Sequence, residues 1–181
     1  MVTLAPIVLS SIALMASGRP NPLYAPNPVL TISCSIPKEY GGADGLAWSS
    51  EDADDRINYR IDFQPDICKR LNAFARSPKL RGDDFSDSAV GMAFALRVAV
   101  HEPSHVFFYR NYPGWDGHTE AGADCRAVMN VARFARMLGA SKATARRVYR
   151  LNTEIGMFDD YASACASGRP FKPRRPFYAS S

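Results

Sequence analysis

Residues 88–105 read SAVGMAFALRVAVHEPSH, and they form the most apolar continuous part of the chain that leads into a motif of ionisable residues. Its apolar residues are spread around the helix and not confined to one narrow stripe, which is typical of a helix that is buried on most sides. The stretch runs directly into the motif His101-Glu102-Pro103-Ser104-His105. We therefore expect one long, largely buried helix that carries ionisable side chains toward its end.

Two further helices are expected after this stretch. The first should run from about Thr119 to Leu138 and stop at Gly139, because glycine is common just past a helix C-terminus. Ser141 can then cap a second helix that continues to about Ile155.

Upstream of the stretch, the pattern predicts a helix and a pair of strands. Residues 29–34 are rich in β-branched side chains and residues 57–63 alternate apolar with polar ones, so each predicts a short strand. Pro65 can begin a helix that reaches about Ala75, and residues 37–56 are expected to form a loop. The predicted fold class is mainly α (α+β): the HExxH helix packs on a helix that carries a third ligand, with a small strand pair near the N-terminus.

Length and charge indicate one domain without a nucleic-acid function. The chain has 181 residues, and roughly 100–200 residues make one domain, so residues 29–168 are expected to fold as a unit. The net charge of +4 comes from residues 169–181, which hold four basic residues and no acidic one. This basic tail is expected to be disordered and solvated, with contact to an anionic envelope or membrane surface as the alternative. No motif of a nucleic-acid reader is present.

The first 18 residues resemble a targeting segment. Residues 4–16 are uncharged and mostly apolar. This run has the length of a signal-peptide core and is shorter than the roughly 20 residues that span a bilayer. A signal peptide or membrane anchor is therefore expected over residues 1–18, followed by a proline-rich linker over residues 19–28. Because no basic residue precedes the apolar run, a buried strand or helix of the domain is the alternative.

The four cysteines favour a secreted or otherwise extracytoplasmic protein. Widely spaced, even-numbered cysteines in an exported chain predict two disulfides. Of the three pairings, we favour one in which each bond closes a loop within its own half of the chain, Cys34–Cys68 and Cys125–Cys165. Reduced, buried thiols in a cytosolic protein are the alternative.

The HExxH motif predicts a metal centre. Histidines four residues apart lie on one face of a helix, so His101 and His105 can hold one ion, and Zn²⁺ suits imidazole and carboxylate ligands. Glu102 can reach a zinc-bound water, take its proton as the carbonyl is attacked, and deliver it to the leaving amine. The alternative is a histidine pair, buried or on the surface, with an adjacent glutamate and no metal.

A third ligand is expected on the next helix. Glu120 and Asp124 form an E-x-x-x-D pattern, which would place the metal ligand Glu120 on the same face as Asp124, the residue that orients a ligand histidine. His118 could replace Glu120, contact substrate, or lie exposed in the loop. Tyr109 and Tyr112 are candidates for stabilising a developing oxyanion, although packing is the alternative for each.

The motifs resemble a family of small exported bacterial proteins similar to zinc metallopeptidases of the gluzincin type. The resemblance rests on the HExxH motif, Glu120-Ala121-Gly122-Ala123-Asp124-Cys125-Arg126-Ala127, Leu138-Gly139-Ala140-Ser141, Tyr161 and Cys165, and Cys34 and Cys68 fit the same layout. It implies His101, His105 and Glu120 as zinc ligands and Glu102 as the base. Pro103 inside the motif, and Phe107 and Phe108 after it, depart from the usual pattern. A proline there removes a helical N–H and can change the angle between the histidines.

Two functions follow from these features. The first is a zinc-dependent peptidase that acts on a peptide or protein substrate outside the cytoplasm. The alternative is a non-catalytic exported protein that keeps a degenerate HExxH site for metal binding or stability.

Overall fold

The computed structural model describes residues 3–17, 29–36, 40–51, 57–83, 86–111 and 120–154. The linker over residues 19–28, the basic tail over residues 169–181, and the residues Tyr112, His118, Tyr161 and Cys165 lie outside this part. The helices are α1 (Pro6–Ala16), α2 (Pro65–Arg76), α3 (Asp87–Asn111), α4 (Glu120–Met137) and α5 (Lys142–Glu154), and the strands are β1 (Leu30–Ser33), β2 (Gly45–Glu51) and β3 (Ile57–Phe63).

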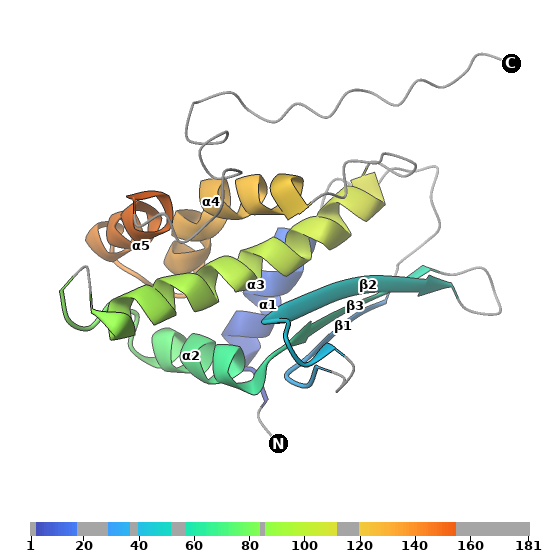
Figure 1. The fold of residues 1–181 in the computed structure, drawn as a ribbon, viewed down its shortest axis with the longest axis horizontal. Helices are drawn as coiled ribbons and strands as arrows, with labels where there is room; N and C mark the ends of the chain where they lie inside the picture. Colours follow the sequence, from blue (N-terminus) through green and yellow to red (C-terminus); the bar gives the residue numbers. More distant parts are fainter. Residues whose placement is uncertain are drawn as a thin grey trace, which may run out of the picture.

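The long helix α3 is the centre of the fold. It lies among α1, α2, α4 and α5 and the strands β2 and β3, and contacts all of them (Figure 1). Side chains around its whole circumference are therefore buried. The prediction of a mainly helical protein with an HExxH helix packed on the next helix is confirmed. Pro103 does not end the helix, because α3 continues to Asn111.

The two helices after α3 also begin and end where the sequence predicts. Gly139 ends α4 with a φ of 92°, and the N–H of Ala140 donates to the carbonyl of Ala135, which is the hydrogen bond of a Schellman motif. Ser141 caps α5, since its Oγ accepts a hydrogen bond of 3.0 Å from the backbone N–H of Thr144.

The sheet has three strands in the order β1-β3-β2, not a strand pair. β1 is parallel to β3, and β2 is antiparallel to it, with Gly45 opposite Phe63. The prediction of a loop over residues 37–56 was wrong for β2. Its sequence GLAWSSE has no β-branched residue and does not alternate apolar with polar side chains, and pairing with β3 supplies the hydrogen bonds that order it.

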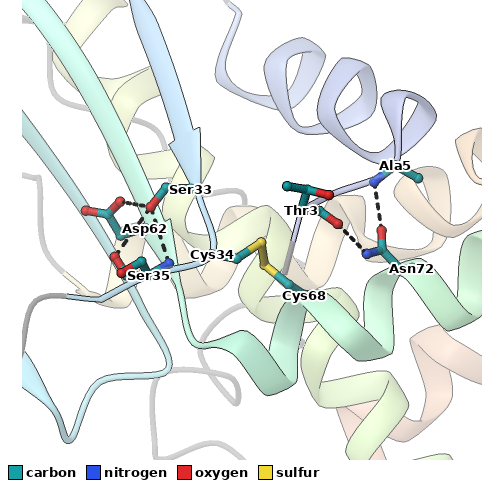
Figure 2. The surroundings of a disulfide bond; sticks show 8 residues. All are labelled: Thr3, Ala5, Ser33, Cys34, Ser35, Asp62, Cys68 and Asn72. Carbon is teal, nitrogen blue, oxygen red and sulfur yellow. Dashed lines mark hydrogen bonds between the residues drawn. A yellow bond between two sulfur atoms is a disulfide. The ribbon is translucent and has the colours of Figure 1, made fainter. Parts of the chain in front are cut away.

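The N-terminal apolar segment forms α1 and packs into the core. Val8 and Ile12 are fully buried, and Arg126 of α4 donates a hydrogen bond of 2.8 Å to the carbonyl of Met15. At the other end of the segment, Asn72 of α2 accepts a hydrogen bond from the backbone N–H of Ala5 (Figure 2). A buried helix of the domain is the alternative stated above for this apolar run, which no basic residue precedes. Among the described residues, no helix is long and apolar enough to cross a membrane.

A disulfide joins the sheet to α2. Cys34 follows β1 and Cys68 lies in the first turns of α2, and their sulfurs are bonded (Figure 2). This confirms the predicted Cys34–Cys68 bond. Cys125 is disulfide-bonded as well, while Cys165, its predicted partner, lies outside the described residues. The disulfide fits an oxidising, extracytoplasmic compartment.

Candidate metal centre

Five side chains from α3 and α4 form a ladder across the interface of the two helices. On α3, Arg97, His101 and His105 follow one another at intervals of four residues and therefore share a face. On α4, Glu120 and Asp124 have the same spacing. The helices pair in antiparallel order, since Arg97 contacts Asp124 and His105 lies opposite Glu120.

At one end of the ladder, two imidazoles and a carboxylate converge. His101 Nε2 lies 3.1 Å from His105 Nε2 and 2.9 Å from Glu120 Oε2, and His105 Nε2 lies 3.6 Å from Glu120 Oε1. Ligand atoms bound at about 2.0–2.1 Å to a tetrahedral zinc ion are separated by about 3.3 Å. The Pro103 residue between the two histidines has not moved their rings apart, because the ring centroids are 4.9 Å from each other.

Asp124 holds the opposite side of the His101 ring. Asp124 Oδ1 lies 2.6 Å from His101 Nδ1, and the same oxygen accepts from the guanidinium of Arg97. Because Nδ1 is bonded to a carboxylate, the neutral form of the imidazole keeps its proton on Nδ1, and only this neutral form presents the lone pair of Nε2 to Glu120 and His105.

Glu102 is buried beside this cluster. It is 7% exposed, and the backbone of Gly45 at the start of β2 covers it so closely that a Cβ at position 45 would stand 2.6 Å from Glu102 Cγ. Burial raises the pKa of Glu102 to about 7, and the charge of His101 opposes this shift only in part. Glu102 is thus a carboxyl group that can change its protonation state near neutral pH.

The imidazole of His101 is strongly basic in the metal-free arrangement. Burial by itself lowers the pKa of His101, but the hydrogen bonds to Asp124 and Glu120 outweigh burial and raise it to about 9. For Asp124, burial opposes ionisation, yet the bonds to His101 and Arg97 lower its pKa. The His101 hydrogen bond is the main cause of the lowered pKa of Glu120.

A pocket of about 250 Å³ opens beside the cluster. Phe94, Arg97 and Val98 form its wall on α3, leading to His101 and Glu102, while Glu120 and Asp124 close it from α4. Asp44 and Gly45 border it from the start of β2. The volume is slightly below the roughly 300–1,000 Å³ of pockets that enclose a whole small ligand, so it can receive one side chain or end of a larger molecule.

The described residues contain a group that could hold a metal ion. Donor atoms of His101, Glu102 and His105 all lie within 4.8 Å of one another, and Glu120 lies against both imidazoles as described above. Two carboxylates are therefore candidates for the third ligand. A nitrogen, nitrogen and oxygen donor set of this kind suits zinc among other transition metals.

The structure brings together most of the residues predicted from the sequence and adds others. His101, Glu102, His105, Glu120 and Asp124 meet, whereas Tyr109 is half-buried against the core and does not line the described part of the pocket. The residues that sequence analysis missed are Arg97, Asp44 and Gly45. Only Arg97 had a signal in the sequence, since R-x-x-x-H-x-x-x-H places it one turn before the first histidine.

Comparison with known proteins found no match to this chain. No family model, no curated protein and no solved structure is similar to it.

Proposed function

We propose that this protein is a zinc-dependent peptidase that acts outside the cytoplasm. The observation that carries the proposal is the convergence of His101 Nε2, His105 Nε2 and the Glu120 carboxylate at separations of 2.9–3.6 Å. These are close to the separations of about 3.3 Å expected between ligands of one tetrahedral zinc ion. The Cys34–Cys68 disulfide supports the extracytoplasmic location.

In this proposal, His101, His105 and Glu120 hold the zinc ion. Bound zinc polarises the carbonyl of the scissile amide and lowers the pKa of a coordinated water. Asp124 fixes the ring of His101 through Nδ1. The exposed side chain of Glu120 borders the pocket, so a substrate can approach from the solvent side.

Glu102 is the general base of the proposed reaction. Its carboxyl group lines the pocket and has a pKa raised to about 7, which suits a group that accepts a proton from water and then passes it to the leaving amine. The Gly45 backbone holds Glu102 in place from the other side.

A second candidate function is a non-catalytic metal-binding protein. It is favoured by the position of Glu102, whose carboxylate lies within 4.8 Å of the donor atoms of both histidines. If Glu102 were the third ligand, no base would remain beside the metal, and the ion would serve stability or binding only.

Two glutamine variants separate these functions. Purified protein is loaded with zinc, its metal content is determined by elemental analysis, and hydrolysis of a mixture of fluorescence-quenched peptides is followed. The peptidase proposal expects Glu102→Gln to retain one zinc per chain and to lose hydrolysis, and Glu120→Gln to lose zinc. If the protein is instead a non-catalytic metal-binding protein with Glu102 as the third ligand, Glu102→Gln should lose zinc and Glu120→Gln should retain it. The wild type should then hydrolyse no peptide.

Two controls complete this experiment. His101→Ala is expected to abolish zinc binding under either function. Asp66→Asn changes an exposed carboxylate on α2 whose partner is Arg70, and it is expected to alter neither zinc content nor hydrolysis. Zinc-loaded wild-type protein that cleaves no peptide of the mixture would overturn the peptidase proposal.

A further inference from the structure

Arg97 is a buried cation beside the candidate metal centre, and its guanidinium donates a hydrogen bond to Asp124. It is 7% exposed and lies one turn before His101 on α3. We infer that Arg97 is a positioning residue, which acts through Asp124 to orient His101 for metal binding. The inference rests on the ligand set of the proposed function and adds a residue to it.

The geometry of one oxygen atom carries the inference. Asp124 Oδ1 accepts from the guanidinium of Arg97 and lies 2.6 Å from His101 Nδ1, so both donors hold the same atom. Both donors belong to α3, while the acceptor belongs to α4. Two residues of α3, one helical turn apart, therefore bind the Asp124 carboxylate.

Without Arg97, this carboxylate would be held less firmly. The terminal torsion of an aspartate is broad and roughly two-fold, so a single hydrogen bond to an imidazole leaves the carboxylate free to turn. A turn would move Oδ1 away from His101 Nδ1 and release the ring, whose other nitrogen is the proposed ligand. The planar guanidinium restricts the carboxylate because its donors point in fixed directions.

The same contact affects the second helix. Glu120 lies one turn before Asp124 on α4 and shares its face. A clamp between Arg97 and Asp124 therefore also sets how α4 lies along α3, and with it the distance from Glu120 to the two histidines.

A purely structural role for Arg97 makes a different prediction. As a tie between two helices, it would contribute to stability and leave the geometry of the bound metal unchanged. As a positioning residue, it determines metal affinity and the ligand field even in variants that fold normally. Residues that orient metal ligands in this way typically contribute about 10- to 100-fold to metal affinity.

The experiment compares Arg97→Met, Arg97→Lys and a control variant, Arg147→Met. Arg147 of α5 donates to the carbonyls of Leu80 and Gly82 in the segment between α2 and α3, so its loss removes an anchored arginine that does not line the pocket. The zinc dissociation constant is measured by competition with a chelator, and the geometry is followed by the visible absorption of the Co²⁺-substituted protein. Circular dichroism establishes that each variant is folded.

Arg97→Met is expected to raise the zinc dissociation constant about 10- to 100-fold and to change the Co²⁺ spectrum. Arg97→Lys keeps the charge without the planar fork and is expected to lie between Arg97→Met and the wild type, while Arg147→Met matches the wild type in both measurements. A folded Arg97→Met protein with wild-type affinity and spectrum would overturn the inference. If Arg97→Met does not fold, a folded Arg97→Lys protein with the zinc affinity and Co²⁺ spectrum of the wild type would overturn the inference. Failure of the wild type to bind zinc would instead refute the proposed function itself.

Discussion

Gly45 and Glu102 are packed so closely that no side chain fits between them. A Cβ built on Gly45 would lie 2.6 Å from Cγ and 2.7 Å from Oε1 of Glu102. Glu102 is buried and lines the pocket, so a side chain at position 45 would push its carboxylate from its present position. The start of β2 thus determines the position of the proposed base, although it is far from the HExxH motif in sequence.

Substitution of Gly45 by alanine is therefore expected to displace the Glu102 carboxylate. Because a displacement of about 1 Å can reduce catalysis on the order of 100-fold, kcat for peptide hydrolysis should fall by about that factor, with zinc still bound stoichiometrically. Steady-state kinetics and elemental analysis measure the two quantities. A matched glycine is Gly42, around which a Cβ would meet nothing within 4 Å, and Gly42→Ala should behave as the wild type. Loss of zinc in Gly45→Ala would indicate that Glu102 is a ligand.

Helix α1 is expected to contribute to stability as a part of the domain. Ile12 is fully buried, and replacing such a residue with alanine costs about 2–5 kcal/mol of unfolding free energy. Leu14 on the same helix is 60% exposed, so Leu14→Ala should stay within about 0.5 kcal/mol of the wild type. Urea denaturation of the full chain measures both. Equal stabilities of the two variants would mean that α1 does not pack into the core.

The Cys34–Cys68 disulfide is expected to stabilise the junction of sheet and α2. It closes a loop with a sequence separation of 34 residues, and a disulfide of this kind typically contributes about 2–4 kcal/mol. The double variant Cys34→Ala/Cys68→Ala should lose about this amount in urea denaturation under non-reducing conditions. An unchanged denaturation midpoint in the double variant would contradict the prediction.

Removal of metal is expected to leave a protein that loses stability as the pH rises. The pKa of Glu102 is raised from 4.5 to about 7 and that of His101 from 6.5 to about 9, so both groups bind more protons in the folded protein than in the unfolded chain. The free energy of unfolding therefore falls as the pH rises from 4.5 to about 9. The lowered pKa values of Glu120 and Asp124 act in the opposite sense, removing stability as the pH falls through them.

Bound zinc should reverse this trend. Zinc requires neutral imidazoles, so its stabilising effect is expected to grow as the pH rises from 6.5 to about 9. Urea denaturation of chelator-treated and zinc-loaded protein over a series of pH values tests both statements. The Glu102→Gln variant serves as a control, since it should lose only the part of the pH dependence below about 7. If the free energy of unfolding of the metal-free protein rises between pH 4.5 and about 9, the raised pKa values of Glu102 and His101 are refuted.

Local sequence was sufficient to predict most of the helices and part of the metal centre. The apolar residues before His101, the glycine at position 139 and the serine at position 141 mark helix bodies and ends through short-range effects, and all three predictions agree with the structure. β2 was missed because its seven residues depend on pairing with β3 for their order. For residues 1–18 the sequence left two interpretations, a targeting segment and a buried helix of the domain, since an apolar run of this length has the same pattern in both; the structure shows that the run forms α1 and packs into the core.

By itself, the sequence determined that His101 and His105 share one helical face with Glu102 between them, because a helix of this composition places residues four apart above one another. The packing of the helices and the sheet brings Arg97 and the His101 ring to the same oxygen of Asp124, places Glu120 against both imidazoles, and lays Gly45 over Glu102. Those contacts join elements that are distant in the chain. Their geometry depends on how α4 and β2 pack on α3, which no local pattern of residues specifies.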